Sequence, residues 1–217
     1  MKSDAELKSD VLAELEFEPG VKVEDIGVSV KEGIVTLNGS VGSYAEELAA
    51  ARAAKRIAGV KGLAEDIVVK LPGSSRLTDS DIADAAVNTI KWTSTVSADA
   101  IKLTVRDGWL SLEGTVEAWY QKSAAEEAVR NLAGVKGVTN LIVIKPKMAA
   151  VDIKGAIQAA FERHALLDAQ NIQVETNGGN VVLRGHVRSF IQRDEAERAA
   201  WVAQGVTNVE NRIVLIV

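Results

Sequence analysis

The sequence predicts an α+β protein of three tandem domains, because one pattern of about 70 residues occurs three times in the 217-residue chain. An offset of 75 residues carries the first copy onto the second, and an offset of 71 carries the second onto the third. Each copy is long enough to bury a small core of its own. We therefore expect domains over 1–71, 75–147 and 149–217. Each should be an αββαβ unit, with a three-stranded sheet and two helices packed on one face.

The first helix of each copy is predicted from apolar residues that recur every fourth position. In the first copy these are Leu7, Val11 and Leu15, which fall on one face of a helix. The equivalent residues in the other copies are Ile82, Ala86, Ile90, Ile153, Ile157 and Phe161.

Two segments of alternating apolar residues then predict a hairpin, and glycines mark its ends. One glycine lies in the turn, and a second ends the second strand, where we expect positive φ or close contact with neighbouring backbone. A third follows the second helix, where a left-handed cap is favoured. These structural glycines are Gly33, Gly39 and Gly59 in the first copy, Gly108, Gly114 and Gly134 in the second, and Gly179, Gly185 and Gly205 in the third.

The second helix is rich in alanine on its expected buried face, so it should lie close to the sheet. Ala50, Ala53 and Ala54 show this in the first copy, where Ser43 and Glu46 predict a capping box at the helix start. The last strand of each copy is strongly apolar, as in Ile67–Val69. A helix between strands two and three requires a crossover, which is right-handed if the strands are parallel.

Composition excludes several classes of protein. The net charge is −5 and no copy carries more basic than acidic residues, which argues against nucleic-acid binding. No apolar run is long enough for a transmembrane segment. The first residues contain no apolar signal sequence, so we expect a cytoplasmic protein as written, or a periplasmic one if a signal was removed. There is no cysteine, so disulfides and thiolate metal sites are excluded.

No residue pattern indicates catalysis, a cofactor or a metal site. The two histidines, His164 and His186, are far apart in the sequence and have no histidine equivalents in the other copies. The adjacent acidic residues Glu46 and Glu47 should point in different directions on a helix. We therefore predict that the protein is not an enzyme.

The repeated pattern resembles the BON domain, a module of osmotically inducible OsmY-type bacterial proteins. The resemblance is carried by Gly33–Gly39, Gly108–Gly114 and Gly179–Gly185, each with a G-x-V/L-x-L-x-G pattern, and by Gly59-Val60 and its equivalents. It implies binding to phospholipid surfaces or envelope partners and a role under osmotic stress. It also implies no catalytic motif.

Aromatic residues are the candidate contact residues. Tyr44, Trp119 and Phe190 occupy equivalent positions at the opening of the second helix. They either staple that helix to the sheet edge or stand exposed for a lipid interface or a partner. Their presence in all three copies favours the structural role.

Trp92, Trp109 and Trp201 are not repeated, so duplication does not explain them. Trp109 should lie on the strand face opposite its buried neighbours. Trp201 stands where the other copies have Lys55 and Arg130, which predicts the solvent side of its helix. These tryptophans either mark a contact surface or seal the interfaces between domains.

The sequence thus favours a non-enzymatic protein that engages phospholipid surfaces or envelope proteins in osmotic stress. The alternative is a cytoplasmic protein-interaction scaffold, or a sensor of an ion or small ligand, with no membrane contact. Neither reading requires a cofactor.

Overall fold

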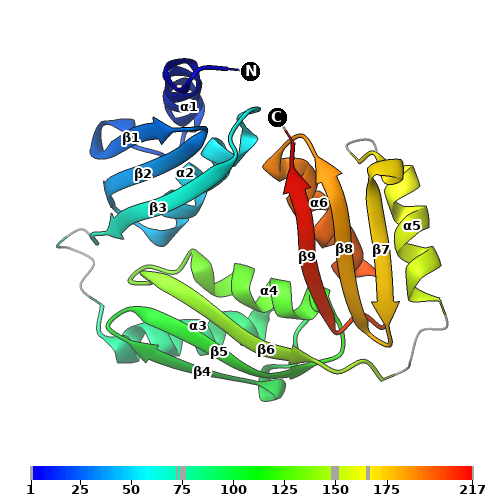
Figure 1. Cartoon of the computed structure of the whole chain (residues 1–217). Helices are drawn as coiled ribbons and strands as arrows, with labels where there is room; N and C mark the ends of the chain where they lie inside the picture. The colour runs from blue at the N-terminus through cyan, green and yellow to red at the C-terminus, as the bar shows by residue number, and fades with distance from the viewer. Residues whose placement is uncertain (1, 72, 74–76, 148–151, 165–166, 217) are drawn as a thin grey trace.

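The computed structural model contains three three-stranded sheets, one from each repeat (Figure 1). It describes residues 2–71, 73, 77–147, 152–164 and 167–216. The expected domain limits at 1, 75, 149 and 217 lie outside the described residues. Below, domains 1, 2 and 3 are the units that contain the first, second and third sheet.

Each domain has two α-helices and three strands in the order αββαβ, as predicted. The helices are α1 (Asp4–Phe17), α2 (Tyr44–Arg56), α3 (Asp79–Trp92), α4 (Trp119–Arg130), α5 (Ile153–Arg163) and α6 (Phe190–Val202). The strands are β1 (Ile26–Lys31), β2 (Ile34–Val41), β3 (Gly62–Val69), β4 (Ile101–Arg106), β5 (Trp109–Val116), β6 (Gly137–Ile144), β7 (Ile172–Asn177), β8 (Asn180–Val187) and β9 (Asn208–Leu215).

The sheets share one topology. In domain 1, β2 is central and pairs antiparallel with β1 and parallel with β3. Domains 2 and 3 repeat this arrangement. Both helices of each domain cover the same face of its sheet, which leaves the other face open (Figure 1). The predicted α+β fold is confirmed.

Each domain has its own core between the helices and the covered face of its sheet. The predicted stripe Leu7, Val11 and Leu15 is buried against Val35 and Leu37 of β2. Fully buried alanines on α2 let this helix lie close to the sheet, as the sequence indicated. These contacts fix the position at which every second helix begins.

The glycine that ends each central strand is required by its backbone. Gly39, Gly114 and Gly185 have φ of +118°, +142° and +124°. A Cβ at any of them would overlap a carbonyl oxygen of the segment that leads into the first strand. Positive φ and close contact with neighbouring backbone, the two expected reasons for glycine at these positions, are therefore both observed.

The turn of the third hairpin differs from the other two. Gly33 and Gly108 have positive φ, whereas in domain 3 the positive φ of 55° belongs to Gly178 and not to Gly179. A Cβ at Gly179 would instead crowd Thr207 and the carbonyl oxygen of Gly205. Gly179 is thus explained by close contact with neighbouring backbone.

The predicted capping box of α2 forms only in part. Ser43 caps the helix by accepting a hydrogen bond from the Glu46 N–H, at 3.2 Å. The Glu46 carboxylate does not return to Ser43, because it accepts from the N–H groups of Lys22 and Gly42, both at 2.8 Å. Glu46 thereby ties the loop before β1 to the start of α2.

The first residue of α3 holds the β4–β5 turn. The Asp79 carboxylate accepts hydrogen bonds from the N–H groups of Asp107 at 2.8 Å and Gly108 at 3.0 Å, and Asp4 does the same in domain 1. We expect Asp79→Ala to lower the free energy of unfolding of domain 2 by about 1–2 kcal/mol, because two turn donors lose a charged acceptor. Amide exchange at Asp107 and Gly108 should accelerate. Asp84→Ala, an exposed change on the same helix, is the control, and equal effects of the two variants would contradict this role.

Candidate functional site

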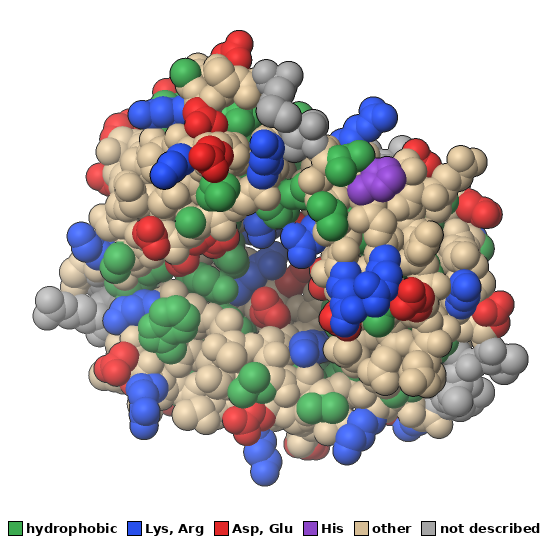
Figure 2. Space-filling model, in the orientation of Figure 1, with side chains coloured by type: hydrophobic (Ala, Val, Ile, Leu, Met, Phe, Trp, Pro, Cys, Tyr) green, Lys and Arg blue, Asp and Glu red, His purple; other side chains and the backbone are tan. Residues whose placement is uncertain are grey.

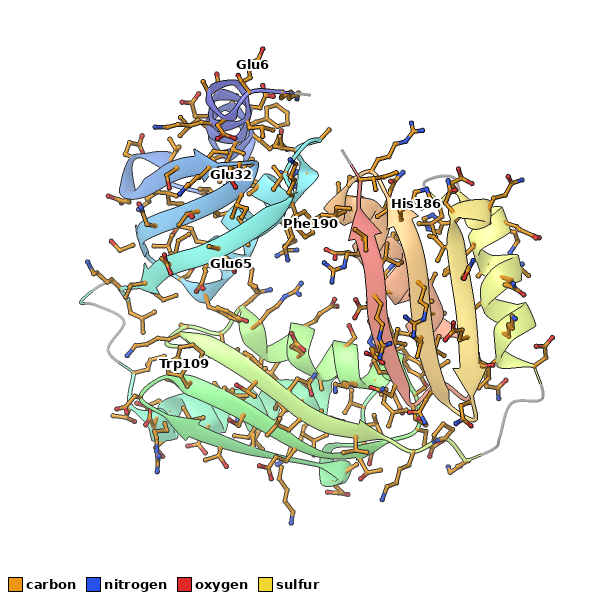
Figure 3. All side chains as sticks on the ribbon, viewed as in Figure 1. Glu6, Glu32, Glu65, Trp109, His186 and Phe190 are labelled. Carbon is orange, nitrogen blue, oxygen red and sulfur yellow. The ribbon has the colours of Figure 1, made fainter. Side chains whose placement is uncertain are left out.

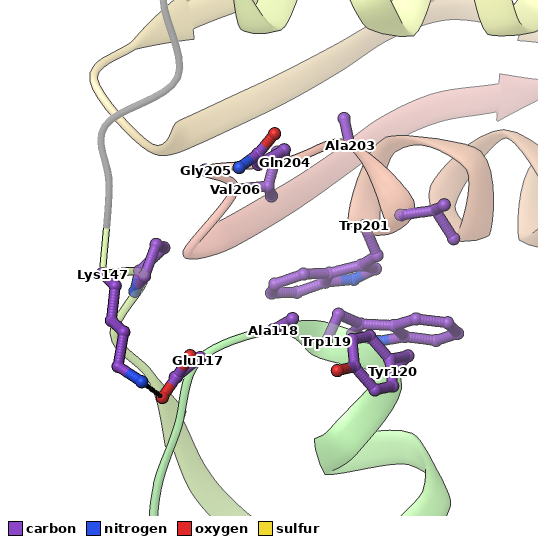
Figure 4. Close-up of a pocket in the computed structure, with 12 residues that line it drawn as sticks. Glu117, Ala118, Trp119, Tyr120, Lys147, Trp201, Ala203, Gln204, Gly205 and Val206 are labelled. Carbon is purple, nitrogen blue, oxygen red and sulfur yellow. Dashed lines mark ion pairs between the residues drawn. The ribbon is translucent and has the colours of Figure 1, made fainter. Parts of the chain in front are cut away.

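The three shared aromatic residues lie where one domain meets the next. Tyr44 of domain 1 packs against the core of domain 2, and Phe190 of domain 3 packs against the core of domain 1. Trp119 of domain 2 packs on its own core, and its indole lies face to face with that of Trp201 of domain 3, beside a pocket that both residues line (Figure 4). None of the three is fully buried. We call each of these three contacts a joint.

The joints follow one another in a cycle. At each, the opening of a second helix meets the next domain, in the order 1 to 2, 2 to 3 and 3 to 1. The helices α2, α4 and α6 accordingly lie on the sides of their domains that face the middle of the molecule (Figure 1). Helix α6 contacts both α2 and α4. Figure 3 shows Phe190 in the space between domains 1 and 3. A head-to-tail contact that closes after three steps makes a ring.

Charged side chains lie beside the aromatic rings at two joints. Burial and the nearby Glu126 carboxylate raise the pKa of Tyr44, while the Val138 N–H and Arg130 oppose that shift. At the joint of domains 3 and 1, partial desolvation by the surrounding protein raises the pKa of Asp194, which is an exposed residue of α6, and the charge of Lys55 from domain 1 opposes that shift. A hollow between the three domains also has basic and acidic side chains on its walls (Figure 2).

Trp201 does not lie on the solvent side of its helix, so that prediction is wrong. It is mostly buried and packs against the cores of both domain 2 and domain 3. Its equivalents Lys55 and Arg130 also lie beside joints, where a long basic side chain can cover apolar surface with its stem. A basic residue therefore does not mark the solvent side at this position.

Trp92 and Trp109 face solvent. Trp92, the last residue of α3, is 87% exposed, and Trp109, at the start of β5, is 57% exposed. Trp109 stands on the open face of its sheet, as predicted, with its ring beside Gly137 of the neighbouring strand (Figure 3). Trp92 lies near the end of the sheet at which β4 begins. Trp109 lies at the opposite end, just after the β4–β5 turn. The two tryptophans therefore mark separate surfaces.

Phe17 is a further candidate that the sequence analysis missed. It is the last residue of α1, is 82% exposed, and is carried onto Trp92 by the same offset of 75 residues. Domains 1 and 2 thus both end their first helix on an exposed aromatic ring. The signal is present in the sequence, because the repeat offset pairs two aromatic residues, Phe17 and Trp92.

The histidines do not form a reactive group with one another. The His164 Nε2 atom lies 2.7 Å from a carboxylate oxygen of Glu195, and His186 is an exposed residue of β8. Across the described residues, no group of three or more His, Asp or Glu side chains is placed to hold a metal ion. No helix in the described part of the chain is long and apolar enough to cross a membrane.

Comparison with known proteins gives one family for all three domains. A family model for the BON domain matches residues 3–70, 78–146 and 150–216. The osmotically-inducible protein Y of Escherichia coli strain K12 is 30% identical over 141 residues, which cover 63% of this chain and 70% of that protein.

Solved structures of CdsD, a structural protein of the type III secretion system of Chlamydia trachomatis, also match. One match has 13% identity and a TM-score of 0.27, and covers 97% of this chain and 92% of the CdsD chain. The C-terminal domain of CdsD matches with 12% identity and a TM-score of 0.27 over the full length of both chains.

Proposed function

Because the chain belongs to the BON domain family, we propose that it is a non-enzymatic protein that engages phospholipid surfaces of the cell envelope during osmotic stress. Stress is part of the proposal because a related protein is named as osmotically inducible. The observation that supports membrane contact is the exposed aromatic ring at the end of the first helix in domains 1 and 2.

Phe17 and Trp92 suit a membrane interface by their chemistry and position. Aromatic rings favour the headgroup region of a bilayer, where an apolar ring can leave water without crossing the membrane. The neighbours of Phe17 are Glu16 and Glu18, whereas Trp92 follows Lys91. Anionic lipid should therefore attract the end of α3 more than the end of α1.

Sedimentation with vesicles tests this proposal. We expect the protein to sediment with vesicles that contain anionic phospholipid, and less with purely zwitterionic vesicles. Trp92→Ala should weaken binding by about tenfold, since loss of one interfacial ring costs roughly 1–2 kcal/mol. Phe17→Ala should have a smaller effect.

Val214→Ala is the control, because Val214 is an exposed apolar residue of β9 in domain 3, which carries neither Phe17 nor Trp92. The proposed site is wrong if Trp92→Ala binds vesicles as tightly as the parent protein while both remain folded. Loss of binding in Trp109→Ala alone would move the contact to the open sheet face. No sedimentation with any vesicle would favour a protein partner instead.

A further inference from the structure

We propose that the joint between domains 2 and 3 contains a binding site for the acyl chain of a zwitterionic amphiphile. The site is the cavity beside Trp119 and Trp201. This inference rests on the proposed phospholipid function and deepens it, because it assigns a place where a single lipid chain can enter the protein.

The cavity is open on one side and is lined by three segments from two domains. Its volume is about 370 Å³, within the range of small-molecule sites. The opening of α4, Pro146 and Lys147 after β6, and the end of α6 with the turn that follows it form its walls. Figure 4 shows the indole rings of Trp119 and Trp201 lying face to face beside it.

The apolar part of the lining suits a hydrocarbon chain. The walls include Ala118, Ala203 and Val206 in addition to the two indoles. Small side chains leave the space open, and the rings offer flat apolar surface. Such a lining gives a favourable free energy to any CH₂ group that leaves water.

At the position of Trp201, this joint differs in charge from the other two. Domains 1 and 2 carry Lys55 and Arg130 where domain 3 carries Trp201. A cation at that position would place a charge against the cavity wall, which opposes entry of an alkyl chain. The tryptophan replaces that charge by an apolar ring, so apolar binding is favoured at this joint.

An ion pair at the edge of the cavity indicates which lipid headgroup would fit beside it. Lys147 Nζ and Glu117 Oε1 form an ion pair of 2.6 Å, and their side chains are 78% and 50% exposed. Both residues line the cavity, and the pair stands to one side of the two indoles (Figure 4). One cation and one anion side by side complement a headgroup that carries both charges. A phosphocholine-like or phosphoethanolamine-like head can meet Lys147 with its phosphate and Glu117 with its ammonium group.

The test uses octylphosphocholine below its micelle-forming concentration, so that no bilayer is present. The chain has four tryptophans, which give four indole N–H signals in an NMR spectrum. We expect the signals of Trp119 and Trp201 to shift saturably while those of Trp92 and Trp109 stay in place. Octyl sulfate, with the same chain and a purely anionic head, should bind more weakly.

Two variants separate the cavity from the rest of the protein. Ala118→Leu places a larger side chain in the cavity and should weaken octylphosphocholine binding at least about tenfold. Lys147→Met should reduce the preference for octylphosphocholine over an uncharged octyl glucoside. Lys154→Met on the exposed side of α5 is the control for removal of a lysine and should change neither result.

The inference is overturned if no saturable shift occurs, if Trp92 or Trp109 responds instead, or if folded Ala118→Leu binds as the parent does. Vesicle binding without octylphosphocholine binding would reject the cavity alone. Octylphosphocholine binding without vesicle binding would reject the proposed membrane function and leave the cavity supported. Vesicle binding and octylphosphocholine binding therefore test the membrane function and the cavity separately.

Discussion

Phe190→Ala is expected to open the ring by releasing domain 3 from domain 1. Phe190 is mostly buried and packs on the core of domain 1, although no linker joins these two domains directly. Removal of its ring should cost about 1–2 kcal/mol of apolar burial. Interfaces between domains of one chain are small, so a loss of this size shifts the population toward open forms.

Small-angle scattering should show a larger radius of gyration for Phe190→Ala, and amides of α2 and α6 should exchange faster. Phe17→Ala removes the same side chain from an exposed position and should leave both measurements unchanged. Unaltered scattering and exchange in Phe190→Ala would contradict its role in closing the ring. A general loss of structure would appear as faster exchange in α5 as well, which ring opening does not predict.

Gly114→Ala is expected to destabilise domain 2 by about 3 kcal/mol or more. At φ of +142° an alanine is strained, and its Cβ would overlap the carbonyl oxygen of Ala100. That oxygen belongs to the segment that leads into β4, so the strand must shift or the hairpin must open. Urea unfolding followed through exchange of β5 amides should report the loss.

Gly20→Ala is the matched control, because a Cβ at Gly20 meets no atom within 4 Å and its φ is not positive. Its stability should be unchanged or slightly raised, since alanine restricts the unfolded chain more than glycine does. Equal stability of the two variants would show that backbone geometry does not select glycine at position 114.

The domain fold was predictable because it depends on local patterns that occur three times. The spacing of Leu7, Val11 and Leu15 identified a helix face that is buried, and the glycine after each central strand identified a backbone position that excludes a side chain. Both features arise within one repeat and occur in all three, so the sequence indicates each of them three times.

The joints could not be predicted in the same way, because they depend on how whole domains meet. The positions of Tyr44, Trp119 and Phe190 were identified, but a single repeat does not show that Tyr44 and Phe190 reach into another domain. Trp201 was assigned to solvent because its equivalents are basic. The long stems of lysine and arginine also cover apolar surface, so their charge was a poor indicator of exposure.

The two groups of aromatic residues have separate consequences for function. Tyr44, Phe190, Trp119 and Trp201 lie at the joints. The exposed aromatic side chains are Phe17, Trp92, Trp109 and Tyr120, and Tyr120 lines the cavity at the joint of domains 2 and 3. One membrane surface can hold both Phe17 and Trp92 in a fixed arrangement only if the closed ring fixes domains 1 and 2 relative to each other.

Chemical cross-linking tests the closed ring most directly. The natural chain has no cysteine, so Lys55→Cys with Asp194→Cys introduces the only two thiols. These positions are near each other at the joint of domains 3 and 1, because the charge of Lys55 acts on the carboxyl group of Asp194 and opposes the rise in its pKa. The control pair is Lys55→Cys with Lys154→Cys, which moves the second thiol to the outer helix α5 (Figure 1). The ring predicts rapid cross-linking within one chain by a short bismaleimide for the first pair and little for the control. Equal yields for the two pairs, or cross-links only between chains, would contradict it.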